Sequence, residues 1–211
     1  MTILVTGGLG YIGSHTVVSL NSNGFDTIII DNLSNSKLSV LEKINSITGK
    51  KNIFEKIDLC NTLEVEGFFN KYSKIDGIIH FAALKSISES TINPLKYYQN
   101  NVLSLINILN QAEKRDINNF IFSSSCTVYG EPDNLPIDEN HRFKKATSPY
   151  GYTKQIGERI VKDLTLNNKN FKAISLRYFN PIGAHSSLLI GELPLGKPDN
   201  LVPMITQTMA G

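Results

Sequence analysis

Met1-Thr-Ile-Leu-Val-Thr-Gly-Gly-Leu-Gly-Tyr-Ile-Gly13 is the stretch of this 211-residue chain that decides its fold. Its short apolar run, Ile3-Leu4-Val5, is typical of a strand that is buried on both faces. Three glycines, Gly7, Gly10 and Gly13, follow at intervals of three and open a helical pattern. Glycines in such a turn permit the close approach of a dinucleotide pyrophosphate, and the helix N-terminus offers free N–H groups to the phosphates.

Strand and helix patterns alternate along the chain, which predicts an α/β fold with a doubly wound parallel sheet of the Rossmann type. Further strands are expected at 27–30, 53–57, 77–80, 120–123 and 173–176. Helices are expected at 11–23, with Gly24 as its cap, and at 94–114 and 149–165, whose apolar residues recur at steps of three and four. The polar segment 34–52 is interpreted as loop and helix surface.

One acidic residue, Asp31, ends the second predicted strand, 18 residues after Gly13. In a Rossmann sheet, an acid at this position binds the ribose hydroxyls of the adenosine. A carboxylate repels the 2′-phosphate of NADP, so the pattern favours NAD. A glycine triplet alone also occurs in turns that bind nothing. The strand before it, the helix after it and the acid downstream make a cofactor site the better interpretation.

The composition is that of an ordinary globular protein, with 41% hydrophobic residues, 19% charged residues and a net charge of +2. Short pairs such as Lys50-Lys51 indicate a solvated face, so neither nucleic acid nor a membrane is expected as a partner. The two cysteines, Cys60 and Cys126, lack metal-ligand spacing, so no metal is expected. Sparse cysteines and the lack of a signal-peptide pattern favour a cytoplasmic protein.

A change in composition after Asn180 divides the chain into two predicted parts. Residues 1–180 are expected to form the NAD-binding domain, and 181–211, where Gly and Pro are frequent, to begin a substrate-binding region. An apolar pattern with helical spacing begins in 201–211, at the end of the given sequence. Complete proteins usually end on a docked element or a polar tail, so we expect the N-terminal portion of a longer protein.

A tyrosine and a lysine mark a candidate catalytic site. Tyr150 and Lys154 are four residues apart at the start of a predicted helix and therefore share a face, whereas Tyr152 does not. A nearby ammonium favours the phenolate, so we expect Lys154 to lower the pKa of Tyr150. Ser123-Ser124-Ser125 ends a predicted strand, at the edge where open α/β sheets bind ligands. Taken singly, these features are also typical of an exposed helix and a polar turn.

The glycine loop, serine, tyrosine and lysine occur in an order that resembles the extended short-chain dehydrogenase/reductase family. By that resemblance, Ser125, Tyr150 and Lys154 are the catalytic residues. Further stretches resemble the UDP-glucose 4-epimerases of that family: Asp31–Ser36, His80–Lys85, Tyr97–Val102, Phe122–Gly130 and Arg177–His185. Ala83 and Cys126 depart from the expected glycine and alanine, and neither change removes a catalytic group.

The same resemblance implies two sets of ligand contacts. NAD is implied to contact Gly7, Gly10, Tyr11, Ile12, Gly13, Asp31, Asn32, Asn35, Ser36, Asp58, Leu59, Phe81, Ala82, Ala83, Lys85, Asn100, Ser123, Tyr150, Lys154 and Tyr178. A UDP-sugar is implied to contact Lys85, Ser125, Thr127, Tyr150, Asn180, Asn200 and Leu201. From the residues alone, Asp58 is equally consistent with a cap at a strand end, and Lys85 with an exposed lysine.

The implied activity is an isomerase that interconverts UDP-glucose and UDP-galactose through a 4-keto intermediate, in a homodimer. Tyr150 would take the proton of the sugar 4-hydroxyl while hydride passes to NAD and later returns. Three alternatives stay open: an epimerase of N-acetylhexosamine or pentose nucleotides, a 4,6-dehydratase, and a non-catalytic NAD-binding protein. Cys126-Thr127 argues against the dehydratase, because such enzymes carry an Asp-Glu pair there.

Overall fold

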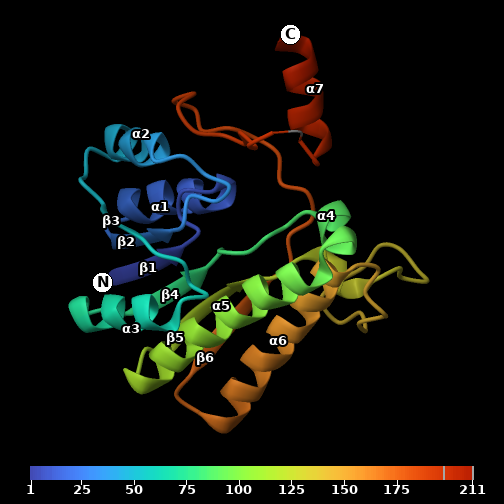
Figure 1. Cartoon of the computed structure of the whole chain (residues 1–211), viewed down its shortest axis with the longest axis horizontal. Coiled ribbons are helices and arrows are strands. Elements are labelled where there is room, and N and C mark those ends of the chain that lie inside the picture. The colour runs from blue at the N-terminus through green and yellow to red at the C-terminus, as the bar shows by residue number, and fades with distance from the viewer. Residues whose placement is uncertain (197, 211) are drawn as a thin grey trace.

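The computed structural model describes residues 1–196 and 198–210 and contains a six-stranded parallel sheet (Figure 1). The strands lie in the order β3-β2-β1-β4-β5-β6. Their bounds are β1 (Thr2–Thr6), β2 (Asp26–Asp31), β3 (Ile53–Lys56), β4 (Gly77–His80), β5 (Asn119–Ser123) and β6 (Lys172–Leu176). The chain winds outward from β1 to β3, returns beside β1 as β4 and winds outward again. The order therefore reverses between β1 and β4, which confirms the predicted Rossmann fold.

Helices cover both faces of the sheet (Figure 1). One layer consists of α1 (Tyr11–Ser22) and α2 (Ser39–Thr48), and the other of α3 (Thr62–Lys71), α5 (Pro94–Lys114) and α6 (Pro149–Asn167). The short helix α4 (Ile87–Ile92) precedes α5, the 3₁₀ turn η1 (Cys126–Tyr129) follows β5, and α7 (Leu201–Ala210) comes last. Both faces of the sheet are therefore buried, as parallel strands require.

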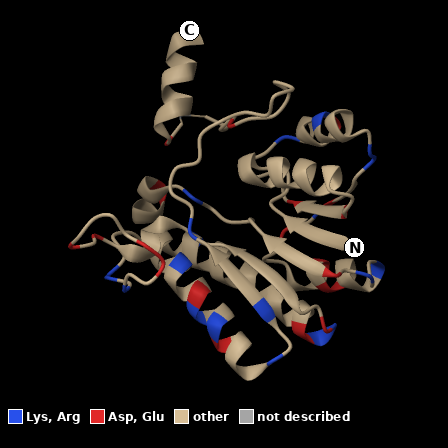
Figure 2. Ribbon diagram, turned by 180° about the vertical axis from the view of Figure 1, so that it is seen from behind, with Lys and Arg blue, Asp and Glu red and all other residues tan. Residues whose placement is uncertain are grey.

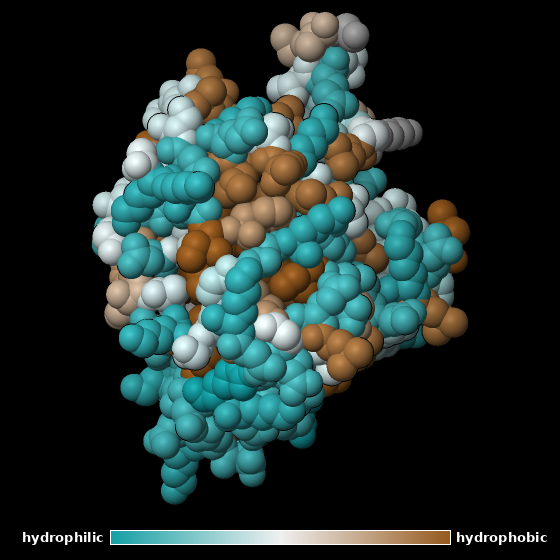
Figure 3. Space-filling model, turned by 60° about the vertical axis from the view of Figure 1, so that its left-hand side comes forward, coloured by the Kyte–Doolittle hydropathy of each residue, from teal (hydrophilic) through white to brown (hydrophobic). Residues whose placement is uncertain are grey.

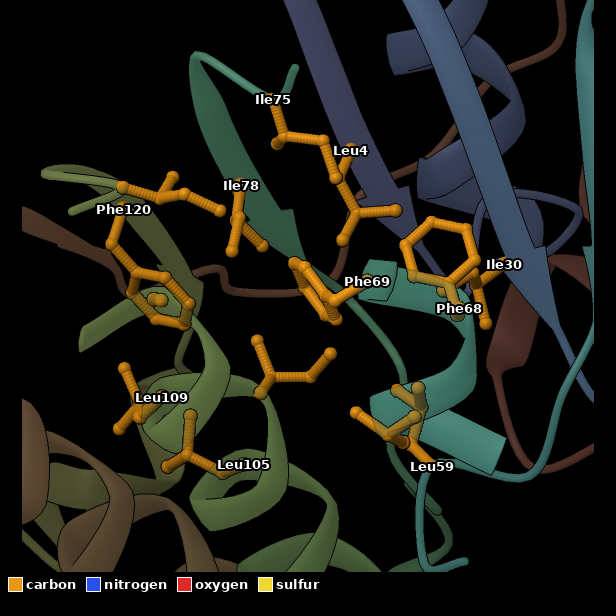
Figure 4. Packing of buried hydrophobic residues seen from close by; sticks show 14 of the residues in the cluster. Leu4, Ile30, Leu59, Phe68, Phe69, Ile75, Ile78, Leu105, Leu109 and Phe120 are labelled. Atoms are coloured by element: carbon orange, nitrogen blue, oxygen red, sulfur yellow. The ribbon is translucent and has the colours of Figure 1, made fainter. Parts of the chain in front are cut away.

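Alternate residues of the strands supply two separate cores. Leu4 and Ile78 pack toward α3 and α5, whereas Val5 and Ile79, their chain neighbours, pack toward α1 and α2. Figure 4 shows Phe69 of α3 in the middle of the first cluster. Each of these side chains is at most 8% exposed. Full burial of a large apolar side chain contributes roughly 1.5–3 kcal/mol, so the two cores hold the strand ends in fixed register.

The predicted strands and helices agree closely with the observed ones where the spacing of apolar residues in the sequence was regular. Every predicted strand is present with ends within one residue, and α5 has the predicted bounds. Helix α6 continues to Asn167, two residues beyond the predicted end, and α1 ends at Ser22, one residue before it. Gly24 follows the cap residue Asn23 with a φ of +84°. Helix α2 lies within the polar segment, while α3 and α4 were not predicted.

The segment that follows β6 returns across the first half of the fold. A bridge between Ala184 and Gly191 closes a short antiparallel turn. Ile190 is 4% exposed and belongs to the apolar cluster of α1 and α2, and the Tyr11 hydroxyl donates a hydrogen bond to the Gly183 carbonyl at 2.8 Å. This packing brings the start of the predicted substrate-binding region against the glycine loop.

Large apolar side chains are exposed along the last part of the chain. Figure 3 shows hydrophobic surface near the middle of one face, framed by hydrophilic side chains. Between 179 and 209, the exposed large apolar residues are Phe179, Ile182, Leu188, Leu189, Leu193, Leu195, Leu201, Val202, Met204, Ile205 and Met209. Exposed apolar surface of this kind is typical of regions that contact a ligand or another protein segment.

The surface charge agrees with the nearly balanced composition. Figure 2 shows Lys and Arg interspersed with Asp and Glu along the outer helices. Within 1–196 and 198–210, none of the helices combines the length and the apolar character that crossing a membrane requires.

Candidate active site

A cleft of about 690 Å³ runs along the carboxyl edge of the sheet, across the point where the strand order reverses. The glycine loop and the ends of β2, β4 and β5 line one side, and the start of α6, residues 178–181 and 189–194, and Asn200 complete it. This volume is within the range of small-molecule and cofactor sites. The edge is also where open α/β sheets bind ligands.

The glycine loop has the shape of a phosphate cradle. Gly7 has a φ of +65°, which favours glycine, and a Cβ there would be 2.8 Å from the Ala82 nitrogen. A Cβ on Gly13 would be 2.2 Å from the Gly7 carbonyl oxygen, so a side chain there is excluded. Helix α1 begins after Gly10, and no side chain caps it. Its first-turn N–H groups therefore suit the pyrophosphate of a dinucleotide.

Asp31 ties the glycine loop to the segment that follows β2. One carboxylate oxygen accepts from the Leu9 N–H at 3.1 Å, and the other accepts from the Leu33 N–H and the Ser36 hydroxyl at 2.9 and 2.8 Å. A carboxylate has about four lone-pair sites, so it retains capacity for a ribose hydroxyl. The side chain is buried at the rim of the cleft, where the adenosine ribose was predicted.

Lys154 lies in the floor of the cleft with its ammonium on the end of β5. Its Nζ donates a hydrogen bond to the Ser123 carbonyl oxygen at 2.7 Å and lies 5.7 Å from the centre of the Tyr150 ring. Burial lowers the pKa of Lys154 to about 8, because the charged form is removed from water. The lysine therefore changes charge close to physiological pH.

Tyr150 stands in the first turn of α6, which Ser148 caps by accepting a hydrogen bond from the Gly151 N–H at 3.1 Å. Burial raises the pKa of the Tyr150 phenol, and its neighbour Ser125 acts in the opposite direction. The predicted net lowering of the Tyr150 pKa is therefore wrong for this arrangement. The cause is that desolvation by burial is the largest effect on this phenol.

Two hydroxyls face the cleft beside the tyrosine. Ser125 precedes η1, and its hydroxyl accepts a hydrogen bond from the Thr127 N–H at 3.3 Å. The Thr127 hydroxyl oxygen is buried, and none of the described residues hydrogen-bonds it. A buried hydroxyl without a partner is costly, and Thr127 as a residue lines the cleft.

The structure brings nearly all the predicted site residues to this one cleft. The whole predicted NAD set lines it, as do Ser125, Thr127, Asn180 and Asn200 of the predicted sugar-nucleotide set. Leu201 does not line the cleft and is 70% exposed as the first residue of α7. The family resemblance implied this contact, but at the start of α7 the side chain is exposed to solvent.

One residue that lines the cleft, Glu192, and one that supports a lining loop, Asn101, were missed at the sequence level. Glu192 accepts hydrogen bonds from Lys85 at 3.0 Å and from Asn200 at 2.5 Å, and so connects the two predicted ligand sets. Asn101 accepts from the Leu84 N–H at 2.8 Å and donates to the Leu84 carbonyl at 2.9 Å, which holds the loop before Lys85. Asn101 could have been found from the sequence because it is next to the predicted NAD contact Asn100. Glu192 could not, because its partner Lys85 is 107 residues away in the chain.

A Rossmann sheet with a glycine cradle at the switch point, and a Ser/Tyr/Lys set beside it, defines a dinucleotide-binding protein of the short-chain dehydrogenase/reductase type. Residues 3–209 match the NAD dependent epimerase/dehydratase family, so the chain belongs to that family. It is 46% identical over 211 residues to the UDP-glucose 4-epimerase of Yersinia enterocolitica and 47% identical over 209 residues to that of Dictyostelium discoideum. These matches cover 100% and 99% of this chain and 62% and 60% of the relatives.

The chain is also similar to solved structures of nucleotide-sugar 4-epimerases. The UDP-glucose 4-epimerase of Bifidobacterium longum, in complex with NAD⁺ and UDP, has a TM-score of 0.97 and 41% identity. The match covers 100% of this chain and 63% of that one. A UDP-N-acetylglucosamine 4-epimerase from Methanobrevibacter ruminantium has a TM-score of 0.76 and 34% identity, over 87% of this chain and 56% of that one. The chain thus spans about three fifths of the relatives' length.

Proposed function

We propose that this chain is the NAD-binding and catalytic part of a UDP-glucose 4-epimerase, which interconverts UDP-glucose and UDP-galactose. The observation that carries the proposal is the convergence of Ser125, Tyr150 and Lys154 on one cleft that continues to the glycine cradle. The similarity to UDP-glucose 4-epimerases over the whole chain supports it.

The residues of the cleft fit NAD. The glycine loop and the first turn of α1 would hold the pyrophosphate, Asp31 the adenosine ribose, and Lys154 the nicotinamide ribose. When bound, NAD supplies the reversible oxidation at the sugar C4. The carboxylate of Asp31 disfavours the 2′-phosphate of NADP.

Side chains of this chain would carry out the proton transfer at the sugar 4-hydroxyl. In this proposal Tyr150 accepts the proton of the sugar 4-hydroxyl and later returns it, while Ser125 hydrogen-bonds the same oxygen and fixes its position. The raised pKa of Tyr150 keeps the phenol protonated near neutral pH, so the base form is a minor species. Lys154, buried beside the ring, favours that form electrostatically whenever it carries its own proton.

The sugar nucleotide would be held at the far end of the cleft. Asn180 and Asn200 are the proposed nucleotide contacts, and Thr127, which lines the same cleft, is the proposed contact of a sugar hydroxyl. Lys85 lies between the two ligands and is oriented by Glu192. We further propose a homodimer that pairs α5 and α6 across a twofold axis, by analogy with the family. A cytoplasmic location and the domain boundary near 180 stay predictions.

Turnover of a defined sugar nucleotide tests this function. The protein is incubated with UDP-galactose and NAD, and UDP-glucose is followed by a coupled dehydrogenase, with UDP-N-acetylgalactosamine in a parallel assay. Formation of UDP-glucose that is lost in Tyr150→Phe supports the proposal. Conversion of the N-acetylated sugar alone would reassign the substrate. Retained NAD with no conversion of either sugar would contradict the epimerase function.

A further inference from the structure

Ser125 differs from its two catalytic partners in how the fold holds it. Tyr150 and Lys154 stand on one helix, whose backbone fixes their spacing, whereas Ser125 lies in an extended turn between β5 and η1, with φ −158° and ψ 154°. Residues in irregular segments are positioned by side-chain and loop contacts rather than by a helical ladder. The contacts of Ser124 and Cys126, its two chain neighbours, therefore determine where its hydroxyl lies.

The Ser124 side chain is hydrogen-bonded to a half-buried ion pair. Its hydroxyl donates a hydrogen bond of 2.5 Å to Oε1 of Glu158. The same oxygen accepts from Nε of Arg177 at 3.0 Å, and Oε2 accepts from Nη2 at 2.9 Å, so the pair is bidentate. The side chains of Glu158 and Arg177 are only 10% and 20% exposed. Charge-assisted, two-point contacts of this kind are strong and fix orientation.

The arginine joins this pair to further segments. Its Nη1 donates to the Tyr129 hydroxyl at 2.9 Å and to the Glu139 carbonyl at 3.0 Å. The guanidinium also lies 5.1 Å from the centre of the Tyr129 ring and 4.8 Å from that of Phe143. Arg177 is thus fixed from several directions, and a rigid Arg177 gives Glu158 a fixed position.

The other side of the catalytic turn is held from the same segment. The Cys126 N–H donates a hydrogen bond of 2.8 Å to the Tyr178 carbonyl oxygen, and Tyr178 directly follows Arg177. Residues on both sides of Ser125 are therefore connected to the end of β6. Glu158 also stands four residues after Lys154 on α6, so one helix carries Tyr150, Lys154 and the carboxylate that anchors the serine turn.

We infer that Glu158, held by Arg177, is a positioning residue that sets the Ser125 hydroxyl relative to Tyr150 by way of Ser124. This inference rests on the proposed function for its kinetic consequences. Positioning errors of about 1 Å at a reacting centre can cost on the order of a hundredfold in rate. Loss of the contact should therefore lower kcat, while substrate affinity, which depends on other residues, stays close to its original value.

The kinetic test uses Ser124→Ala, Glu158→Gln and the double variant in the full protein. We expect kcat for UDP-galactose to fall about tenfold or more in each single variant, with KM and bound NAD within about twofold. The double variant should be no slower than the slower single variant, because both changes break one connection. Unchanged kcat, or losses that multiply in the double variant, would overturn the inference. Arg159→Ala, which breaks the exposed pair with Asp163 on the same helix, is the matched control and should retain full kcat.

A spectroscopic readout separates this inference from the proposed function. Ser125 lowers the pKa of Tyr150, so a displaced serine should shift the tyrosinate absorbance titration of Tyr150 to higher pH. The signal is isolated by subtracting the same titration of Tyr150→Phe. A shift in Ser124→Ala and Glu158→Gln but not in Arg159→Ala supports positioning, even if the wild type converts no sugar nucleotide. Titrations that coincide with the wild type in folded variants would overturn it. Ser124→Ala removes only one hydroxyl, so it keeps the test valid if Glu158→Gln does not fold.

Discussion

The ammonium of Lys154 lies 2.7 Å from the carbonyl oxygen of Ser123, so a fully buried cation of α6 is bonded to the end of β5. This contact places the lysine under the proposed nicotinamide ribose and next to the serine turn. The spacing of Tyr150 and Lys154 predicted a lowered pKa for the tyrosine, but in the folded chain that pKa is raised. Burial acts on both side chains, and it favours the neutral form of each.

The first prediction concerns stability and pH at Lys154. Its pKa is about 8 in the folded protein and 10.5 when unfolded, so the unfolded chain binds more protons between these values. The free energy of unfolding should therefore gain from this group as pH rises through that window, by up to roughly 3 kcal/mol. Below pH 8 the cost of the buried charge is fully present. Urea unfolding of the wild type and Lys154→Met from pH 7.5 to 9.5 measures the difference.

The stability advantage of Lys154→Met over the wild type should shrink with rising pH over that range. The exposed Lys162→Met, on the same helix, should show a constant difference. A pH-independent gap between the wild type and Lys154→Met would mean that the lysine titrates normally.

Tyr150→Phe should lower the rate of epimerisation by about a hundredfold or more while NAD stays bound, since it removes the proposed acid–base group without changing the ring. Because the pKa of Tyr150 is raised, the wild-type rate should increase as pH rises above neutrality. Initial rates with UDP-galactose from pH 6 to 9 test both statements. Tyr152→Phe, two residues away and outside the cleft, serves as the control. Substantial activity in Tyr150→Phe would assign the proton transfer to another group.

The parts of the site that the sequence predicted are those with local geometric demands. Gly7 and Gly13 stand where no Cβ fits, and Asp31 stands at a strand end beside them. Such positions accept few residue types, so their spacing, read together with the strand before them and the helix after them, identifies them. The helix that carries Tyr150 was also predictable, because Ser148 and Pro149 form a standard helix start.

Helix α3 shows a local signal that was present but not used. Asn61 accepts hydrogen bonds from the Leu63 and Glu64 N–H groups, and the Glu64 carboxylate accepts from the Asp58 N–H. Asn61 is thus a side-chain N-cap with an acidic residue in the first turn, and buried Val65, Phe68 and Phe69 follow it at helical spacing. Here the sequence contained enough information to place the helix.

Other features depend on contacts between distant parts of the chain. Lys85 and Glu192 are 107 residues apart, and Ser124 and Glu158 are 34 apart. No spacing rule connects such pairs before the fold is known. The raised pKa of Tyr150 has the same origin, since its largest cause is burial by the surrounding fold.

The proposed dimer face makes a separate prediction. Ile106 lies on α5 and is 37% exposed, on the helix layer that would pair across the twofold axis. Ile106→Glu would bury a carboxylate in that interface, which costs several kcal/mol, and should yield a monomer at micromolar concentration. Sedimentation velocity measures the change. Leu63→Glu on α3, where the leucine is 79% exposed, should leave the assembly unaltered. A wild type that sediments only as a monomer would contradict the dimer.

The last prediction tests the assignment of the adenosine ribose to Asp31. Asp31→Ala should weaken NAD binding about tenfold or more, since a hydrogen bond to a charged acceptor contributes roughly 1.5–3 kcal/mol. Part of that loss would come from the Leu9 N–H and Ser36 hydroxyl, which the carboxylate also holds. Asp31→Asn separates the two effects, because it keeps an acceptor oxygen but removes the charge that repels a 2′-phosphate. It should therefore lose less NAD affinity and gain affinity for NADP. Titration calorimetry with both dinucleotides measures this, and Asp26→Ala, at the opposite end of β2, is the control. Unchanged NAD affinity in Asp31→Ala would show that the ribose binds elsewhere, and unchanged NADP affinity in Asp31→Asn would show that the charge of Asp31 does not select the cofactor.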